Sequence, residues 1–423
     1  MHHTTGQRIA VIGSGVAGLT AAYLLQRRHE VLLFEADDRL GGHAHTHDVP
    51  SAHGGTIGVD SGFIVHNERT YPTLLRLFGE LGVRTQETEM SMSIRCDGCG
   101  LQYAGAKGLR GLFAQRRNLT DARYLRMLVE VKRFHRHASR LLSRPDVGDV
   151  TLGAFLAIGG YPAYFVDHFI LPLVSTVWSA DRTDTLRYPA RYLFEFLRNH
   201  GLLSVKNSPT WRTVVGGSRE YVELAAKQLT AVHLSTPVRS VTRLARGVEV
   251  RDDADTPHRV DHVVIATHAD QALRLLGKPT AAEQDVLGAF RYSRNEAWLH
   301  TDTSVLPTVA DARAGWNYRT PVCGADSDAV QISYDMNRLM RLDEPEGYVV
   351  TLNPHAEPAD GSVVAKMDYE HPVYTPESVA AQRKLAELND GVVAFAGAYH
   401  GWGFHEDGCA SGLRAAESFG ATW

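Results

Sequence analysis

The sequence predicts an α/β protein in which a Rossmann-like nucleotide-binding domain is interleaved with a second domain made of a mixed sheet and a helical part. Three observations predict this class. A strand, a glycine-rich turn, a helix and a second strand follow one another over residues 8–35, β-rich sequence returns at 231–267 and 290–370, and the region from about 107 to 204 is mostly helical. The 423 residues suffice for two or three domains. We assign 1–75, 205–280 and 385–423 to the nucleotide-binding domain, and 76–204 and 281–384 to the second domain.

The first unit carries a glycine signature with a physical meaning. Gly13-x-Gly15-x-x-Gly18 follows the apolar run 9–12 and opens a helix that we expect to reach about Arg28 before a second strand at 31–34. The first glycine makes the turn, the second lets the backbone approach a pyrophosphate, and the third lets the helix pack on the strand. Glu35 ends the second strand, where a carboxylate accepts hydrogen bonds from ribose hydroxyls and repels a 2′-phosphate. The unit therefore indicates a dinucleotide other than NADP.

The later elements follow from local signals. Tyr71-Pro72 opens an amphipathic helix that ends near Gly79 or Gly82, and Asp97-Gly98 favours a tight hairpin turn within 90–104. Prolines should break the helical region at four positions: Pro145, Pro162, Pro172 and Pro189. The apolar run 261–267 is typical of a buried parallel strand, and a last strand at 392–395 leads into a glycine-rich turn and a C-terminal helix.

Composition narrows the class of protein. With 44% hydrophobic and 22% charged residues the chain is not a disordered, collagenous or coiled-coil protein. Its four cysteines are too few for a secreted disulfide framework, and no run reaches the 18 or so apolar residues of a membrane span. No apolar signal region precedes the first strand. We expect a cytoplasmic protein, with peripheral membrane contact left open.

The net charge of −4 is unevenly distributed. Residues 107–144 hold eleven Lys or Arg against two acids, so this segment is +9 and the remainder is −13. Apolar residues recur there at helical spacing, namely Tyr124, Leu125, Leu128, Val131, Phe134, Ala138, Leu141 and Leu142. Such a helix either lies on an anionic membrane surface or packs its apolar stripe on the protein core. Nucleic acid is not expected, because the acidic remainder would repel phosphate.

The residues after the second strand distinguish the cofactor. The run Glu35-x-x-x-Arg39-x-Gly41-Gly42-His43-x-x-Thr46 resembles the glutathione-reductase-like FAD proteins of the flavin amine oxidase and carotenoid desaturase superfamily. The resemblance implies FAD, with Arg39 and the backbone of the paired glycines at its phosphates. The superfamily usually has Arg where this chain has His43, so charge at that phosphate contact would depend on pH.

Further matches extend to the C-terminus. Val59-Asp60-Ser61-Gly62-Phe63 is similar to the segment beside the flavin ring, and Thr236-Pro237-Val238 to the strand that holds adenine. The last helix, entered through Phe395-Ala396-Gly397-Ala398, would direct its N-terminal N–H groups at the flavin. The FAD-binding residues that we expect are Gly13, Ser14, Gly15, Gly18, Glu35, Ala36, Arg39, Gly41, Gly42, His43, Gly62, Phe63, Val238, Gly397, Ala398, Gly408, Cys409 and Ala410.

Several phrases resemble, within this superfamily, bacterial NAD/FAD-binding oxidoreductases associated with cyclopropane-fatty-acid synthases. The phrases are 65–72 (VHNERTYP), 216–221 (GGSREY), 316–318 (WNY), 334–337 (YDMN), 371–374 (HPVY) and 405–408 (HEDG). The resemblance implies a fatty-acyl or phospholipid-linked redox role and a lipid-modifying synthase as a partner.

The catalytic candidates lie just before the C-terminal helix. The superfamily's amine oxidases carry a lysine on a substrate-domain strand, and the strand that we align with it, 292–300, has none. Phe404 aligns with a tyrosine of their aromatic cage, and Trp402 lies close by, so the site is suited to a hydrocarbon. His405 is a candidate acid or base because its ordinary pKa lies near neutrality. Alternatively, the histidines shape the loop and Glu406 or Asp407 caps the helix.

We assign no metal site. His43, His45, His47 and His53 share a face only in an extended segment, and Cys96-x-x-Cys99 is a single pair over a hairpin turn, without a second pair at zinc spacing. We interpret the cysteine pair as turn residues.

Three functions follow. The leading one is FAD-dependent hydride transfer with an apolar, fatty-acyl or phospholipid-linked substrate, giving desaturation, saturation or isomerisation. The alternatives are a flavin amine or amino-acid oxidase, and a non-catalytic, flavin-stabilised partner of a lipid-modifying synthase.

Overall fold

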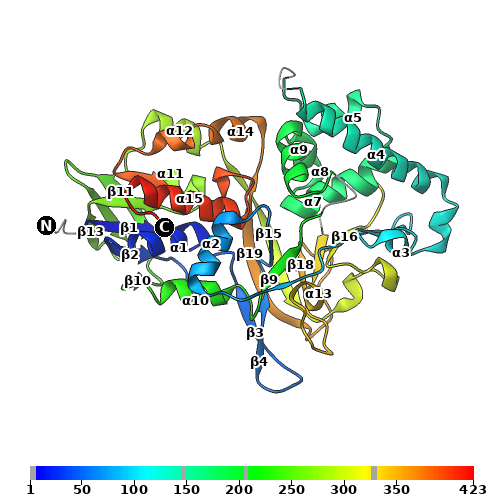
Figure 1. The fold of residues 1–423 in the computed structure, drawn as a ribbon, viewed down its shortest axis with the longest axis horizontal. Coiled ribbons are helices and arrows are strands. Elements are labelled where there is room, and N and C mark those ends of the chain that lie inside the picture. The colour runs from blue at the N-terminus through cyan, green and yellow to red at the C-terminus, as the bar shows by residue number, and fades with distance from the viewer. Residues whose placement is uncertain (1–5, 145–147, 204–207, 325–330) are drawn as a thin grey trace.

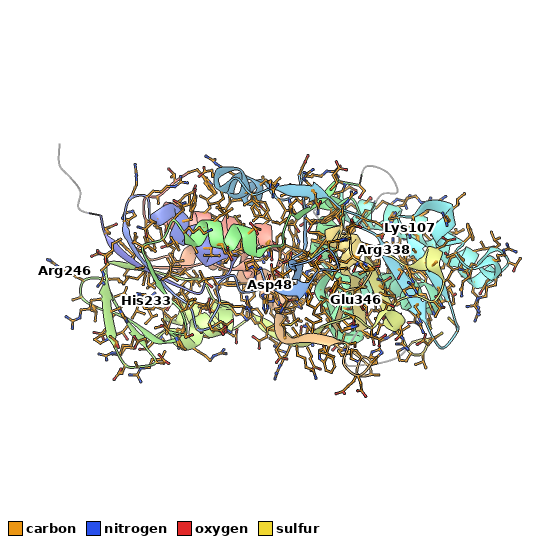
Figure 2. All side chains as sticks on the ribbon, turned by 90° about the horizontal axis from the view of Figure 1, so that it is seen from below. Asp48, Lys107, His233, Arg246, Arg338 and Glu346 are labelled. Carbon is orange, nitrogen blue, oxygen red and sulfur yellow. The ribbon has the colours of Figure 1, made fainter. Side chains whose placement is uncertain are left out.

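The computed structural model describes residues 6–144, 148–203, 208–324 and 331–423. Two sheets dominate it. A parallel sheet and both described chain ends lie in one lobe, and a larger, mostly antiparallel sheet lies between that lobe and a lobe of helices (Figure 1). The mixed α/β class is therefore confirmed. Viewed from below, the molecule is elongated, with Arg246 at one end and Lys107 toward the other (Figure 2).

The parallel sheet is built from segments far apart in the sequence. Its order is β10-β2-β1-β14-β20, with strands β1 (Arg8–Ile12), β2 (Glu30–Phe34), β10 (Ala231–His233), β14 (His262–Ile265) and β20 (Val393–Phe395). All neighbours run parallel, so their carboxyl ends meet at one edge. The buried parallel strand expected at 261–267 is confirmed. The interleaved domain ranges stay a prediction.

Helices and a small sheet cover the parallel sheet. Helix α1 (Val16–Leu25) packs against α15 (His405–Ser418), and α10 (Arg219–Ala226) and α2 (Pro72–Leu81) lie beside them. Helix α1 ends at Leu25, before the expected Arg28, because the chain leaves it through turns that direct it into β2. The remaining cover consists of β11 (Val238–Arg243), β12 (Val248–Asp252), β13 (Pro257–Val260), α11 (Ala269–Leu275), α12 (Ala281–Leu287) and α14 (Pro376–Gln382).

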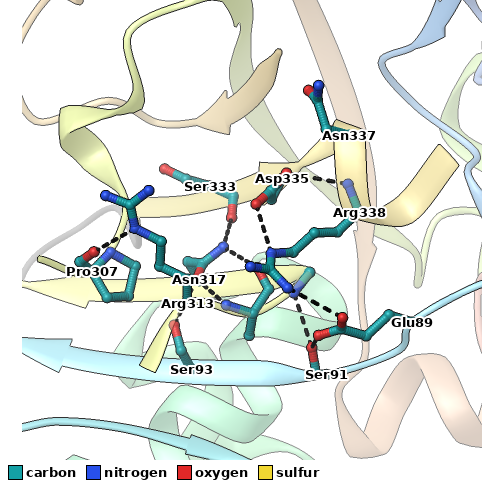
Figure 3. Close-up of polar contacts among 12 residues, drawn as sticks. Glu89, Ser91, Ser93, Pro307, Arg313, Asn317, Ser333, Asp335, Asn337 and Arg338 are labelled. Atoms are coloured by element: carbon teal, nitrogen blue, oxygen red, sulfur yellow. Dashed lines mark hydrogen bonds and ion pairs between the residues drawn. The ribbon is translucent and has the colours of Figure 1, made fainter. Parts of the chain in front are cut away.

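The second sheet has the order β19-β15-β18-β17-β16-β7-β8. Its strands are β7 (Met92–Cys96), β8 (Gln102–Gly105), β15 (Arg291–His300), β16 (Trp316–Thr320), β17 (Gln331–Asp335), β18 (Val349–Leu352) and β19 (Val363–Val373). Strand β7 joins β16 in parallel, and Asn317 stabilises this junction by accepting from Ser93 at 2.8 Å and donating to the Ser333 carbonyl at 3.0 Å (Figure 3). Helix α13 (Met336–Met340) follows β17, and Arg338 ties it to Asp335 and Glu89 (Figure 3).

Small sheets connect the two large ones. Strands β3 (Thr46–Pro50) and β4 (Thr56–Asp60) form a hairpin, and β9 (Trp211–Val214) lies between β5 (Val65–Asn67) and β6 (Thr85–Glu87). The helix expected after Tyr71 is α2, which begins at Pro72 and ends at Leu81 with Gly82 in the left-handed conformation. The hairpin expected in 90–104 forms as β7 and β8, but the positive φ lies at Gly100 and not at Asp97-Gly98. The turn is longer than two residues, so the left-handed residue stands at its far end.

The helical lobe contains α3 (Gly108–Leu112), α4 (Ala122–Leu142), α5 (Leu152–Ile158), α6 (Ala163–Phe165), α7 (Leu171–Trp178), α8 (Arg182–Arg187) and α9 (Ala190–Asn199). Pro162 and Pro189 stand at helix N-caps as expected, whereas Pro145 lies outside the described residues. Pro172 does not break the chain. It falls in the first turn of α7, which continues from a π-helical turn over Val166–Ile170. Because Pro172 has no N–H, it cannot donate to the carbonyl of His168, four residues earlier. The Tyr103 hydroxyl donates to that carbonyl instead, at 2.7 Å.

The basic segment 107–144 contains α3 and α4, and the apolar stripe of α4 faces the protein except at Leu125. Tyr124, Phe134 and Ala138 are buried in the core of the helical lobe. The stripe is therefore used for packing, and this part of the membrane-surface interpretation is wrong. The opposite face carries Lys132, Arg136 and Arg140, together with Leu125 (38% exposed) and Val129 (66% exposed). Among the described residues, no helix has the length and apolar character needed to cross a bilayer.

Candidate active site

The expected cofactor residues gather at the carboxyl edge of the parallel sheet. Gly13 follows β1 with φ of 95°, and a Cβ at Gly18 would lie 1.9 Å from the Gly13 carbonyl oxygen. A Cβ at Gly15 would meet nothing within 4 Å. The turn is thus closely packed behind Gly18 and open in front of Gly15, at the N-terminus of α1, where an anionic group is favoured.

Glu35 lies beside this turn. One of its carboxylate oxygens accepts from the Ser14 N–H at 2.8 Å and from the Ser14 hydroxyl, and the other accepts from the Asp37 N–H at 3.0 Å. The exposed Ala36 follows, and Val238 is brought close because the Thr236 N–H donates to the Glu35 carbonyl at 2.8 Å. The expected ribose and adenine residues therefore lie together.

The loop that carries the paired glycines Gly41 and Gly42 packs closely against the segment at Gly62 and Phe63. The Phe63 N–H donates to the His43 carbonyl at 2.7 Å, and a Cβ at Gly62 would lie 2.1 Å from that oxygen. Gly41 and Gly42 have φ of 109° and 56°, and the Gly41 N–H donates to the Ser14 carbonyl at 3.2 Å. The loop thus joins the glycine turn to the segment after β4.

The C-terminal helix completes the edge. The Gly397 N–H donates to the Ser411 hydroxyl at 2.8 Å, and the Thr20 hydroxyl contacts the buried Cys409 sulfur at 3.3 Å. A Cβ at Gly408 would lie 2.7 Å from the Val16 side chain, so α15 approaches α1 at its start. Ala398 and Ala410 lie in the same segment, next to Gly397 and Cys409.

The residues present fit a flavin dinucleotide. An Arg39 guanidinium nitrogen and the His43 Nε2 are buried without a protein hydrogen-bond partner, in the loop whose Gly42 packs against the open glycine turn at Gly15. Arg39, the Gly41-Gly42 backbone and the start of α1 would hold its phosphates, and Glu35 its ribose. Burial, together with neighbouring histidines, lowers the pKa of His43 well below its ordinary value, so an anion beside it would be needed to charge it.

A histidine cluster that the sequence did not reveal lies against this loop. The ring centroids of His371 and His268 lie 5.6 and 6.4 Å from that of His43. His371 Nδ1 is 3.1 Å from the Asn295 amide nitrogen, and His268 Nδ1 is 3.2 Å from a Glu370 carboxylate oxygen. Burial lowers the pKa of His371 to about 4. In the sequence, only the phrase HPVY at 371–374 drew attention to a member of this cluster. His268 lies 225 positions from His43 in the chain, so no local pattern links the two.

A pocket of about 490 Å³ lies beside the start of α15. Its lining includes Trp402 and Phe404, two of the three catalytic candidates, and also Arg69, Thr70, Tyr71, Pro72, Arg198, Asn199, His200, Glu406 and Asp407. Phe404 stacks on Phe196 at 4.9 Å between centroids, and Trp178 donates its indole N–H to the Trp402 carbonyl at 2.9 Å. The aromatic wall is therefore held by the helical lobe.

His405 does not belong to the pocket lining. Its ring stacks on Phe63 at 3.6 Å, and its Nε2 is 3.1 Å from the Tyr221 hydroxyl. Burial lowers the pKa of His405 to about 3, so the imidazole is neutral near pH 7. Its catalytic role stays a prediction, but these contacts favour a role in positioning.

The two carboxyl groups beside His405 act as caps. The Asp407 carboxylate accepts from the Phe404 N–H at 2.9 Å at the start of α15. Glu406 accepts from the N–H groups of Thr73 and Leu74, both at 3.0 Å, at the start of α2. Asp407 also lines the pocket, and burial raises its pKa to about 7. Its proton can therefore be exchanged near neutral pH.

Strand β15 carries no lysine, but the neighbouring strand does. Lys366 on β19 pairs with Trp298 on β15 and places its ammonium 3.6 Å from the Trp298 ring centroid. The remaining histidines of the N-terminal cluster contact protein groups. His45 and His47 lie 4.0 Å apart between ring centroids, and His47 contacts the Ser61 hydroxyl at 2.9 Å. His45 also contacts the Tyr369 hydroxyl at 3.2 Å, and His53 contacts the Asp343 carbonyl at 2.8 Å.

The fold and the site together fit a protein that binds a flavin dinucleotide. The profile of the "flavin containing amine oxidoreductase" family matches residues 16–312, and the chain belongs to this family. It is 32% identical over 267 residues to the putative flavin-containing monoamine oxidase AofH of Mycobacterium tuberculosis, an alignment that covers 58% of this chain and 53% of AofH. The chain thus spans about half the length of the curated relatives it matches. The association with cyclopropane-fatty-acid synthases stays a prediction.

Solved structures share the fold over nearly the whole chain. A CLA-producing fatty acid isomerase from P. acnes superimposes with a TM-score of 0.68 at 16% identity, covering 98% of this chain and 99% of that one. Cyclohexylamine oxidase from Brevibacterium oxydans IH-35A does so with a TM-score of 0.68 at 17% identity, covering 98% of both chains. At these identities the comparison establishes the fold, and the substrate has to be argued from the pocket.

Proposed function

We propose that this flavin-dependent oxidoreductase binds FAD and acts on an apolar substrate, a fatty-acyl or phospholipid-linked molecule, by hydride transfer at a C–H or C=C bond. The product would arise by desaturation, saturation or isomerisation. Bound flavin supplies the hydride acceptor or donor. The protein supplies the pocket, the orientation of the substrate and a place for the proton.

The aromatic wall of the pocket is the observation that carries the proposal. Tyr71, Trp402 and Phe404 present ring surface to a space of about 490 Å³, within the range of small-molecule sites. Rings that are already held by packing bind hydrocarbon without the cost of ordering them, and they exclude water from the reacting bond. A short amine would leave most of this surface uncovered.

Two cations suit the polar end of such a substrate. Arg69 and Arg198 both line the pocket and are exposed, whereas the rings lie deeper in the protein. A guanidinium binds a carboxylate or a phosphate through charge-assisted hydrogen bonds. We therefore expect an acyl substrate to lie with its head group at Arg69 and Arg198 and its chain along Trp402 and Phe404.

Asp407 is the residue that we propose for proton transfer. It lines the pocket, and its pKa of about 7 lets the carboxyl either donate or accept a proton near neutral pH. Its hydrogen bond with the Phe404 N–H fixes the side chain next to the aromatic wall. In a saturation, the proton that accompanies the hydride would come from this carboxyl.

Anaerobic mixing of the FAD-loaded protein with free fatty acids and phospholipids tests the proposal. We expect the flavin absorbance to bleach or recover with at least one acyl lipid, and gas chromatography to find a changed double bond. Isomerisation would appear in the products alone. Arg198→Ala should raise KM for carboxylate-bearing substrates about tenfold, the value of one charge-assisted hydrogen bond. Arg246→Ala, an exposed arginine at the far end of the molecule, is the matched control (Figure 2). Unchanged lipids and flavin under every condition would refute the proposal.

An amine oxidase is the second candidate, because the family and the AofH relative carry that description. Release of hydrogen peroxide from a panel of amines and amino acids distinguishes it. Peroxide release with amines and no change in lipids would favour this candidate.

A third arrangement is a non-catalytic partner of a lipid-modifying synthase. Flavin that stays unreduced with lipids and amines, in a protein that still binds liposomes or the synthase after His405→Ala, would support it.

We also propose that α4 brings the protein to anionic membranes through its exposed cationic face. Lys132, Arg136 and Arg140 recur every fourth residue on that face, next to the exposed Leu125 and Val129. Each cation near an anionic surface contributes about 1 kcal/mol. Such contact would deliver an acyl substrate to the helical lobe that holds the pocket wall.

A further inference from the structure

A cysteine and histidine cluster lies between the antiparallel sheet and the helical lobe, and the proposed function does not use it. Cys96, Cys99 and Cys323 come together with His168, and all four possible ligand atoms lie within 4.8 Å of one another. Among the described residues this is the only such group. It contains three of the four cysteines of the chain.

The distances suit a single metal ion. The Cys96 and Cys323 sulfurs are 3.5 Å apart, and the Cys99 sulfur is 3.4 Å from His168 Nε2. Four ligands arranged tetrahedrally around zinc, with Zn–S of about 2.3 Å, place their sulfurs about 3.8 Å apart. The sulfurs are also well beyond the length of a disulfide bond, about 2.05 Å.

His168 is oriented as a metal ligand. Its Nδ1 is 3.0 Å from the Tyr164 carbonyl oxygen, so Nδ1 carries the hydrogen and the Nε2 lone pair faces the sulfurs. The Tyr164 ring stacks on the imidazole at 4.3 Å between centroids and limits its rotation. His168 itself is buried. It stands in the π-helical turn Val166–Ile170, a feature frequently found at functional sites.

The backbone around the cysteines is built for this approach. A Cβ at Gly98 would lie 2.9 Å from the Val322 Cα, so glycine lets the hairpin turn touch the segment that carries Cys323. The Asp97 N–H donates to the Thr320 carbonyl at 2.9 Å and fixes that contact. Arg117, whose guanidinium donates to the Cys99 carbonyl at 3.3 Å, adds positive charge beside three potential thiolates.

We infer that Cys96, Cys99, Cys323 and His168 bind one zinc ion with a structural role. A Cys₃His set is a known structural zinc combination, and four protein ligands leave no position for a substrate. The ion would tie the β7–β8 turn and the end of β16 to the helical lobe, and so support the lobe that holds the aromatic wall.

Metal analysis of the purified holoprotein tests the site. After dialysis against buffer without metal, we expect one zinc per chain by mass spectrometry of the elements, together with flavin counted from its absorbance. Cys99→Ser/Cys323→Ser should lose most of the zinc, whereas Cys409→Ser, the matched change at the fourth cysteine, should keep it. Retention of zinc by the double variant, or absence of zinc from wild type grown with zinc and kept reduced, would overturn the inference.

Cobalt substitution keeps the test independent of variants that do not fold. Zinc-depleted wild type titrated with Co²⁺ should develop the visible bands of a tetrahedral cobalt thiolate, at longer wavelength than flavin absorbs, and reach an end point at one equivalent. Chelation of the zinc should lower Tm by about 5 °C or more, and added zinc should restore it. A Cys96–Cys323 disulfide found by mass spectrometry of freshly purified protein, or octahedral cobalt without thiolate bands, would overturn the site.

Discussion

Gly15 and Gly18 stand three positions apart, but their surroundings require glycine for different reasons. A side chain at Gly18 would overlap the Gly13 carbonyl, whereas a side chain at Gly15 would point into open space. Gly18 is therefore required by contacts inside the protein. Gly15 is free of such contacts and is required by the dinucleotide phosphates expected there.

Alanine substitutions should separate these two causes. Gly18→Ala should destabilise the apoprotein by about 2 kcal/mol, because the helix must move away from the turn. Gly15→Ala should leave the apoprotein as stable as wild type and lower its flavin content severalfold, because the added methyl group approaches the phosphates. Urea unfolding of the apoproteins and flavin absorbance per chain measure the two effects. A Gly15→Ala protein with full flavin would contradict the assigned phosphate contact.

Asp407 predicts a pH dependence of stability with a definite sign. Burial raises its pKa in the folded protein from an ordinary value of 3.8 to about 7, with Glu406 adding to the effect and Arg414 and the Phe404 and Trp402 N–H groups opposing it. Between these values the folded state holds a proton that the unfolded state has lost, so the Asp407 contribution to stability falls as pH rises from about 4 to about 7.

Asp407→Asn removes this contribution while it keeps an oxygen for the Phe404 N–H. Its Tm should approach that of wild type near pH 5 and exceed it by a few degrees at pH 8. Calorimetric scans from pH 5 to 8.5 measure the difference. A constant difference across that range would show that Asp407 does not titrate there. If Asp407 also moves the proton, the variant should lose the pH dependence of flavin reduction near pH 7.

At the scale of an element, α4 illustrates how packing divides an amphipathic helix. Its hydrophobic periodicity is real, but Phe134 and Ala138 are buried against the helical lobe, so the stripe is not available to a lipid. Any membrane contact must use the other face, where the cations Lys132, Arg136 and Arg140 recur.

Charge reversal on that face tests the membrane proposal. The triple change Lys132→Glu, Arg136→Glu and Arg140→Glu should weaken binding to anionic vesicles about a hundredfold at low salt, since each cation contributes about 1 kcal/mol. The same charge change at the exposed Arg246, Lys278 and Lys384, on the opposite lobe, controls for net charge. Vesicle co-sedimentation measures both. Equal weakening in the two variants would show that only overall charge matters.

At the scale of the whole molecule, the proposed cofactor residues come from segments that are remote in the chain. Strands β2, β1, β14 and β20 are parallel neighbours, so their carboxyl ends lie at one sheet edge. The segments that follow or adjoin these strands bring together Gly13, Glu35, His43, Val238 and Gly397. A ligand that binds only this assembled edge stabilises the folded state by mass action.

Added FAD should therefore raise Tm with its concentration, by an amount equivalent to about 2.7 kcal/mol at a hundredfold excess over Kd. Thermal scans of the apoprotein at several FAD concentrations measure this shift. Gly15→Ala should respond only at higher FAD, and adenosine monophosphate should give a smaller shift than FAD. A concentration-independent Tm in wild type would contradict the proposed binding edge.

Local patterns were sufficient for much of the fold. The glycine turn between β1 and α1, the Pro72 start and Gly82 end of α2, and the buried strand β14 each carry their signal within about ten residues. The helix break expected at Pro172 was wrong for a tertiary reason. The Tyr103 hydroxyl donates to the His168 carbonyl, which Pro172 leaves without a donor. The left-handed residue of the hairpin turn is Gly100, not Asp97-Gly98 as expected, because the pairing of β7 with β8 and β16 sets the length of the turn.

By itself, the sequence determined the α/β class, the flavin signature and the family, because glycine spacing and hydrophobic periodicity are local properties of the chain. Only the tertiary structure decided which groups share a site. It buried His405 against Phe63, placed Asp407 in the pocket wall, and brought His168 and Cys323 to the Cys96-x-x-Cys99 turn. The physical reason is that sheet order and helix packing bring together residues tens to hundreds of positions apart, and no short-range pattern encodes that distance.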